Sequence, residues 1–433
     1  MSIKQFLPSR AMLFPCASFA VGIFSAVGLT VVGIRGFQAM PYIRIFNVLF
    51  AVVFVAYFLL KAGFKPRLSQ QRFYKAMLAL QVLSVVYLLI GLARSNNDLY
   101  LVTDFVYLLM FYLTFIVGAA GYKTMREDYT HANFILCVVF WMAFSWLMSM
   151  LGVPTPAELL ILWGCALVLS IQHRNPLHTV LLILVMLPQT PNLNRALIMG
   201  VVGGLIVLFF GSSFPKKLKV LVATALVVGM ISWAFNDTTY LQGTGIERRI
   251  KESISLIDDS YGKELPLPVQ QRLLEAQLVM EGIGSGFQPI TVPFGMGHGH
   301  TLDMSLSVDP AVTDSQLLGR EETHNIHLLN YALLARFGVL GFICFAYLLV
   351  FSSLRLFFVL KQPPGDRSSL EALANLYLLV TFLFAATASS FLFSSMLFGY
   401  FCGIANQAAM AAKTEGKRRP APYPATPVEE PAH

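Results

Sequence analysis

The sequence has little charge for its length. Only 12% of its 433 residues are charged, whereas 56% are hydrophobic. Soluble globular chains carry about 25% charged residues, so this composition excludes that class. The sequence therefore predicts an all-α, polytopic integral membrane protein, because a chain in lipid must satisfy its backbone hydrogen bonds internally.

Cysteine is also scarce, and its positions argue against a disulfide framework. All five cysteines lie inside predicted membrane spans, at Cys16, Cys137, Cys165, Cys344 and Cys402. The long polar loop described below has none. We therefore expect neither a disulfide-stapled domain nor a cysteine metal site.

Long apolar runs predict about twelve membrane helices, since roughly 20 apolar residues cross a bilayer. These runs lie at about 11–34, 43–63, 73–93, 98–121, 132–152, 157–172, 177–190, 195–212, 217–235, 325–359, 369–391 and 394–412. The chain thus divides into spans one to nine (1–235), a loop (236–323), spans ten to twelve (324–412) and a tail (413–433). The tail is rich in Pro, Ala and charge, a composition that predicts disorder.

The basic residues predict an orientation, because Lys and Arg gather in short cytoplasmic connections. With both termini placed in the cytoplasm, most of the 31 Lys and Arg fall on that side. Outside the long loop, the opposite side holds only Arg35, Arg44, Arg94, Arg195 and Arg336. This asymmetry accounts for the net charge of +8 without a nucleic-acid partner. The first apolar run is too long for a signal peptide and is expected to remain in the mature protein.

The long outer loop, about Asn236 to Thr323, is large enough to form a small subdomain. Two segments, 245–257 and 268–282, have a helical pattern. The apolar residues of the second segment that could face the bundle are Leu273, Leu274, Leu278 and Val279. The glycine-rich sequence PFGMGHGHT follows. It indicates either an ordinary turn or a nest of backbone amides that binds an anion.

Residues able to do chemistry gather at the predicted outer ends of the spans. His324 and His327 precede the tenth span, Arg195 begins the eighth, and Arg272 lies in the loop. On a helix, His324, His327 and Tyr331 would share one face. Two cations and a titratable ring suit an anionic substrate. The alternatives are an interfacial cap for the histidines and a snorkelling anchor for Arg195.

Several of these features resemble the bacterial O-antigen ligase and polymerase superfamily of membrane glycosyltransferases. The strongest is THNIHLLNYALLARFGVLGF, similar to that family's His-Asn pair, leucine-rich helix and Gly-x-x-Gly. The corresponding residues here are His324, Asn325, Leu328, Gly338 and Gly341. Arg195 at a helix start is a second feature, and Arg272 with RLLEAQLVMEGIG and PFGMGHG is a third. The pattern covers about Asn192 to Phe342.

The resemblance implies transfer of a glycan from an undecaprenyl pyrophosphate donor to an acceptor hydroxyl, at the periplasmic face of the bacterial inner membrane. It implies neither a metal nor a cofactor. Arg195 and Arg272 would bind the pyrophosphate and His324 would act as the base, with His327, Tyr331, Asn325, Gly297 and His298 lining the site. Lipid A core is the expected acceptor, which makes an O-antigen ligase the first expectation. An O-antigen or exopolysaccharide polymerase, with a lipid-linked glycan as acceptor, is the alternative.

Three other interpretations have less support in the sequence. A metal-dependent membrane glycosyltransferase usually has an acidic first outer loop, and IRGFQAMPYIR has no carboxylate. His298, His300, His324 and His327 have spacings that could bind zinc. A secondary transporter could use Asp104, near an outer helix end, as an ion site. The large outer loop and the lack of a convincing internal repeat favour the glycosyltransferase.

Overall fold

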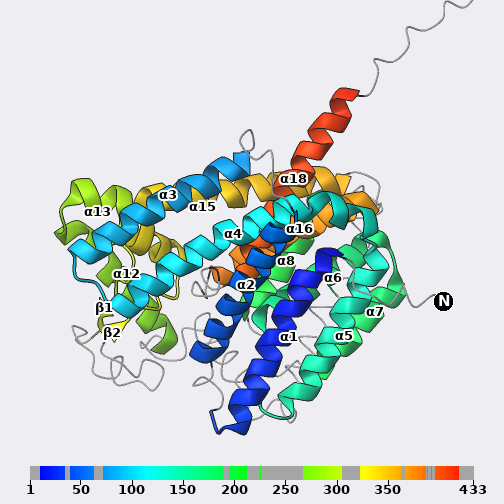
Figure 1. Cartoon of the computed structure of the whole chain (residues 1–433), viewed down its shortest axis with the longest axis horizontal. Helices are drawn as coiled ribbons and strands as arrows, with labels where there is room; N and C mark the ends of the chain where they lie inside the picture. The colour runs from blue at the N-terminus through cyan, green and yellow to red at the C-terminus, as the bar shows by residue number, and fades with distance from the viewer. Residues whose placement is uncertain are drawn as a thin grey trace, which may run out of the picture.

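The computed structural model describes residues 10–34, 40–62, 72–153, 155–188, 195–211, 225, 267–304, 322–361, 366–386, 388, 392 and 395–418. Within these ranges the chain forms thirteen helices and one two-residue strand pair. The helices pack into an elongated bundle (Figure 1). The all-α prediction is confirmed for the described residues.

Eight helices lie before the long loop. They are α1 (Arg10–Val31), α2 (Met40–Ala62), α3 (Arg72–Ala93), α4 (Asp98–Asp128), α5 (His131–Ser149), α6 (Ala157–His173), α7 (Pro176–Met186) and α8 (Arg195–Gly211). The later elements are α12 (Leu267–Ser285), α13 (Gln288–Phe294), β1 (Leu302–Asp303), β2 (Glu322–Thr323), α15 (Leu329–Lys361), α16 (Asp366–Ala385) and α18 (Met396–Arg418). The two strands pair antiparallel, Leu302 with Thr323 and Asp303 with Glu322.

Helices occur at every predicted span except the ninth, 217–235, almost all of which lies outside the described residues. Five of the described helices, α1, α3, α4, α5 and α15, are long and apolar enough to cross a bilayer by themselves. The shorter apolar helices include α6, α7 and much of α8. The chain is therefore a helical multi-span membrane protein, and the count of twelve spans stays a prediction.

Several predicted boundaries differ from the structure; α4, for example, runs to Asp128 instead of ending near 121. The tenth span was expected to begin near 325, but α15 begins at Leu329. The reason is that the backbone N–H of His327 and the carbonyl of His324 bond to side chains instead of forming a helical turn. At the other end, α18 continues to Arg418, past the expected start of the disordered tail at Lys413. The remainder of the tail and the predicted loop helix at 245–257 lie outside the described residues.

Glycines bring α4 and α18 into close contact in the core. A Cβ atom at Gly118 would lie 2.1 Å from the carbonyl oxygen of Tyr400, and one at Gly403 would lie 2.1 Å from that of Phe115. Small residues at such a seam let two helix backbones approach directly, which is a common way to join membrane helices. This seam fixes α4, the helix that carries Asp104 and Tyr100.

One end of the bundle carries the additional elements. There α12, α13 and the strand pair lie beside the ends of α3, α4 and α15 (Figure 1). Helix α12 matches the second predicted loop helix. Val279 is fully buried as expected, and Leu274 and Leu278 pack against the core, but Leu273 is 54% exposed, so its predicted burial was wrong.

Candidate functional site

The glycine-rich turn after α13 is held by its own backbone. Gly295, Gly297 and Gly299 all have positive φ, between 73° and 82°, which glycine adopts without the strain that other residues incur. Gly338 interrupts α15 with φ 59° and ψ −163°. A Cβ atom at Gly338 would lie 2.4 Å from the backbone nitrogen of Gly295. Glycine on both sides therefore lets the turn fit into the kink of α15.

Several amides of this turn are already bonded within the protein, which argues against an open anion-binding nest. Met296 N–H donates to the Ala335 carbonyl at 2.6 Å, and His298 N–H donates to the Tyr87 carbonyl at 3.1 Å. Gly299 N–H donates to the Asp104 carboxylate at 3.0 Å. These bonds favour the first of the two alternatives, an ordinary turn: it connects α3, α4 and α15, and the anion that it meets is the side chain of Asp104.

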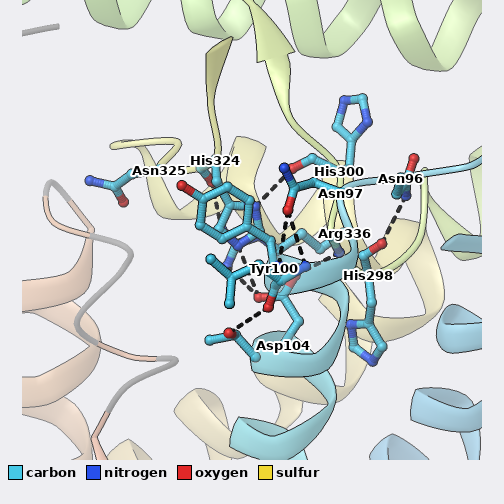
Figure 2. Close-up of polar contacts among 12 residues, drawn as sticks. Asn96, Asn97, Tyr100, Asp104, His298, His300, His324, Asn325 and Arg336 are labelled. Atoms are coloured by element: carbon cyan, nitrogen blue, oxygen red, sulfur yellow. Dashed lines mark hydrogen bonds and ion pairs between the residues drawn. The ribbon is translucent and has the colours of Figure 1, made fainter. Parts of the chain in front are cut away.

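Asp104 and Tyr100 approach His324 from the same helix, α4 (Figure 2). They are four residues apart and therefore lie on one helix face. Asn97 caps the start of α4 by accepting hydrogen bonds from the amides of Leu99 and Tyr100, which fixes where this face begins. The Tyr100 ring stacks on the His324 ring, with the two centroids 4.2 Å apart and the planes 7° from parallel.

Both ring nitrogens of His324 have an acceptor. Nε2 lies 3.1 Å from Asp104 Oδ1, and Nδ1 lies 2.9 Å from the carbonyl oxygen of His300. Arg336 Nη1 lies 3.5 Å from the same Asp104 oxygen, and Arg336 Nη2 donates to the His324 carbonyl at 2.7 Å. A carbonyl oxygen only accepts, and so does a carboxylate beside an arginine. His324 must therefore carry a proton on each nitrogen, which is the imidazolium form.

His327 forms a second pair with a different carboxylate. Its Nδ1 lies 2.8 Å from Glu275 Oε1, and its backbone N–H donates to Glu275 Oε2 at 2.8 Å. Glu275 belongs to α12 and is 1% exposed. Gln271, one turn earlier on the same helix, donates to Glu275 Oε1 at 2.9 Å. This pair lies outside the group formed by His324, Asp104 and Arg336.

His298, predicted to line the site, and His300, named only for the zinc alternative, do not line an accessible surface together. His298 is fully buried and its Nε2 lies 3.0 Å from the hydroxyl of Ser84. Burial lowers the pKa of His298 to about 4. Burial, followed by the charge of Arg94, lowers the pKa of His300 to about 4 as well. Figure 2 shows these two rings pointing away from each other. Among the described residues no group of His, Cys, Asp and Glu could hold a metal ion.

The remaining predicted residues fall into three situations. Arg272 is half-buried on α12, and Tyr331 is half-buried on α15, packed against the core. Asn325 is exposed and its side chain points away from the His324 group (Figure 2). Arg195 is the first residue of α8, but its side chain lies outside the described residues. The expected shared helix face of His324, His327 and Tyr331 is absent, because only Tyr331 lies on α15.

The sequence did not indicate Glu275 and Arg336 as residues of this site, and it did not pair Asp104 with His324. One signal was available. Gln271 and Glu275 stand four apart on the same face of α12 as the buried Val279, where an apolar residue would be expected. A buried carboxylate needs partners, so this position pointed to a polar contact.

Comparison with known proteins adds no relative. No family model matches the chain, and no curated protein matches it either. The fold and composition define a class: the chain is a helical multi-span membrane protein. One end of its described helix bundle carries a polar site with two histidine–carboxylate pairs.

Proposed function

We propose that this protein is a metal-independent membrane glycosyltransferase, which transfers a glycan from undecaprenyl pyrophosphate to an acceptor hydroxyl on the periplasmic side of the bacterial inner membrane. The observation that carries the proposal is the meeting of three separated motifs. The His-Asn segment before α15, the arginine-headed helix α12 and the glycine-rich turn lie together at one end of the bundle (Figure 1). They make up two of the three features on which the family resemblance rests; the other is Arg195, the first residue of α8.

The residue types suit this chemistry. Departure of a lipid pyrophosphate leaves negative charge on its oxygens, and arginines stabilise that charge through bidentate hydrogen bonds. Arg272 and Arg195 are the candidates. The acceptor hydroxyl loses a proton as it attacks, and a histidine held by a carboxylate can take that proton. The site has two histidines held by carboxylates, His324 and His327, of which His324 is already protonated on both ring nitrogens.

The acceptor separates two versions of this function. We propose an O-antigen ligase, with lipid A core as the acceptor; a polymerase that joins lipid-linked repeat units is the alternative. A transporter with Asp104 as its ion site has less support. Asp104 already takes a hydrogen bond from the Gly299 amide and is paired with Arg336 and His324. A carboxylate with two cationic partners has little left to offer a transported cation.

Deleting the gene in its bacterial host tests the proposal. Carrier-linked and lipid A-linked glycans are then displayed on a gel. Long chains stranded on the carrier indicate a ligase, single repeat units indicate a polymerase, and no change in either pool rejects glycan transfer. Complementation with Arg272→Ala should fail. Complementation with Gln277→Ala, which changes an exposed residue of the same helix, should succeed.

A further inference from the structure

We propose that Glu275 is a positioning residue that fixes His327 as the catalytic base, and that His324 is a structural cation. This inference rests on the proposed function and deepens it by assigning the proton acceptor. The sequence alone had assigned the base to His324. The two histidines differ in which ring nitrogens are bonded, and that difference decides which of them can accept a proton.

Glu275 holds His327 by two bonds from opposite ends of the residue. One carboxylate oxygen accepts the backbone N–H and the other accepts Nδ1–H, each at 2.8 Å. An ionised carboxylate only accepts, so the proton of a neutral His327 ring lies on Nδ1 and the lone pair lies on Nε2. Within the described part of the chain, Nε2 has no hydrogen-bond partner. The His327 side chain is 32% exposed, so the ring can be reached by a hydroxyl from the solvent side.

His324 has the opposite arrangement. Asp104 and the His300 carbonyl occupy both of its nitrogens, and the Tyr100 ring covers one face of the imidazole. Its side chain is only 13% exposed. Removing a proton from His324 would break a hydrogen bond inside a buried ion group. His324 therefore has no lone pair available for a substrate hydroxyl.

The position of Glu275 on α12 also brings the base close to the candidate phosphate-binding residue. Arg272 and Glu275 are three residues apart on one helix, so their side chains are neighbours. Gln271 supports the carboxylate by donating to Oε1. One short helix thus carries a cation for the leaving group and the carboxylate that orients the base.

In the proposed step, the acceptor oxygen attacks the anomeric carbon of the donor sugar, and the proton of the acceptor hydroxyl passes to Nε2 of His327. The bond from the anomeric carbon to the phosphate oxygen breaks, and its electron pair leaves with undecaprenyl pyrophosphate. His327 is then an imidazolium paired with ionised Glu275, and it returns the proton to water.

The protonation states can be measured without any activity. Diethylpyrocarbonate acylates the neutral imidazole nitrogen, and mass spectrometry of the purified full-length protein gives a rate for each histidine. We expect His327 to react faster than His324. In Glu275→Gln, His327 should be labelled faster than in the unmodified protein at the same mildly acidic pH, because an adjacent negative charge favours the protonated ring. Glu281→Gln, an exposed change on the same helix, should leave the labelling rate of His327 unchanged. Faster labelling of His324 than of His327 in the unmodified protein, or an unchanged His327 rate in Glu275→Gln, would overturn the inference.

Activity supplies the second measurement, using membranes of the deletion strain, which hold the accumulated donor. His327→Ala should lower the transfer rate by about 10²–10⁴-fold, the usual contribution of a general base. Glu275→Gln should move the acid limb of the pH profile to lower pH, and Glu275→Asp should recover part of the rate.

The two proposals fail in different ways. If the unmodified protein transfers glycan and His327→Ala still does so while folded His324→Ala does not, the base assignment is wrong and the proposed function stands. If the unmodified protein transfers no glycan, the proposed function is wrong, and the labelling rates alone decide whether Glu275 sets the protonation of His327.

Discussion

Two histidines, three residues apart in the sequence, are each held by a buried carboxylate, yet they are in different chemical states. His324 faces two acceptors and is enclosed by α4, α15 and the glycine-rich turn. His327 faces one carboxylate at one nitrogen and leaves the other nitrogen open. A short distance between a histidine and a carboxylate therefore does not by itself identify that histidine as a catalytic base. The partner of the second nitrogen decides between a fixed cation and a proton acceptor.

The two carboxylates also differ in their charge balance. Asp104 is 4% exposed and has two cationic partners, Arg336 and His324. Glu275 is equally buried, but its other side-chain partner is the neutral amide of Gln271. A change at Asp104 should therefore act mainly on stability, whereas a change at Glu275 should act mainly on the chemistry of His327.

The largest expected effect comes from removing the charge of Asp104. Asp104→Asn leaves the buried Arg336 without its carboxylate and should lower the free energy of unfolding by about 3–5 kcal/mol. Glu275→Gln keeps a hydrogen-bonding side chain and strands no arginine, so we expect a loss of about 1–2 kcal/mol. Thermal unfolding of the two variants in detergent checks the order.

Asp98→Asn is the matched control, because Asp98 is exposed in the first turn of the same helix, α4. Its loss should be below about 1 kcal/mol. Equal unfolding midpoints for Asp104→Asn and Glu275→Gln would contradict the distinction between the two carboxylates.

The next effect comes from the glycine-rich turn, which supports only one of the two histidines. Gly299 has φ 74°, and a Cβ atom there would lie 2.7 Å from the carbonyl oxygen of Asn97 and from the nitrogen of Leu101. Gly299→Ala should cost about 3 kcal/mol in strain and crowding. It should also raise the labelling rate of His324 while leaving that of His327 unchanged.

Variants at two other glycines separate the cost of backbone strain from the cost of steric crowding. Gly152 has φ 79° but nothing within 4 Å of its Cβ position, so Gly152→Ala should show the strain alone, about 1 kcal/mol. Gly284 lacks both features, so Gly284→Ala should leave stability nearly unchanged. If all three variants unfold at the same temperature, the turn does not hold the site as described.

The smallest effect near neutral pH is a pH dependence of stability, to which the buried His298 of the turn contributes. The pKa of His298 is about 4 in the folded protein, against an ordinary value of 6.5. As pH falls, the unfolded chain therefore binds a proton first. The stabilisation is complete above about pH 6.5 and is lost as pH falls towards 4, at about 1.4 kcal/mol per pH unit. His298→Asn should flatten this slope in unfolding measurements between pH 7.5 and 4.5; an unchanged slope would show that His298 does not contribute to it.

Much of the helical architecture could be predicted from the sequence, because apolar run length limits where a membrane helix can lie. The start of α15 could not be predicted, because the backbone N–H of His327 donates a hydrogen bond to Glu275, a residue far away in the chain. The site could not be predicted either, because its contacts also join residues that are far apart in the sequence. Asp104 and His324 are 220 positions apart, and no local pattern indicates that they meet. The glycines of the turn did indicate an unusual backbone conformation. The groups that the turn's amides bond to lie on α3, α4 and α15, and the sequence does not show them.

The main-chain bonding of the glycine-rich turn has an evolutionary consequence. Its contacts with Tyr87 and Ala335 use backbone atoms at both ends, and neither contact depends on a side chain. Side chains around the site could therefore be exchanged one by one without loosening the frame that positions the histidines. Such a scaffold would let the surface of the site change while the two histidine–carboxylate pairs stay in place.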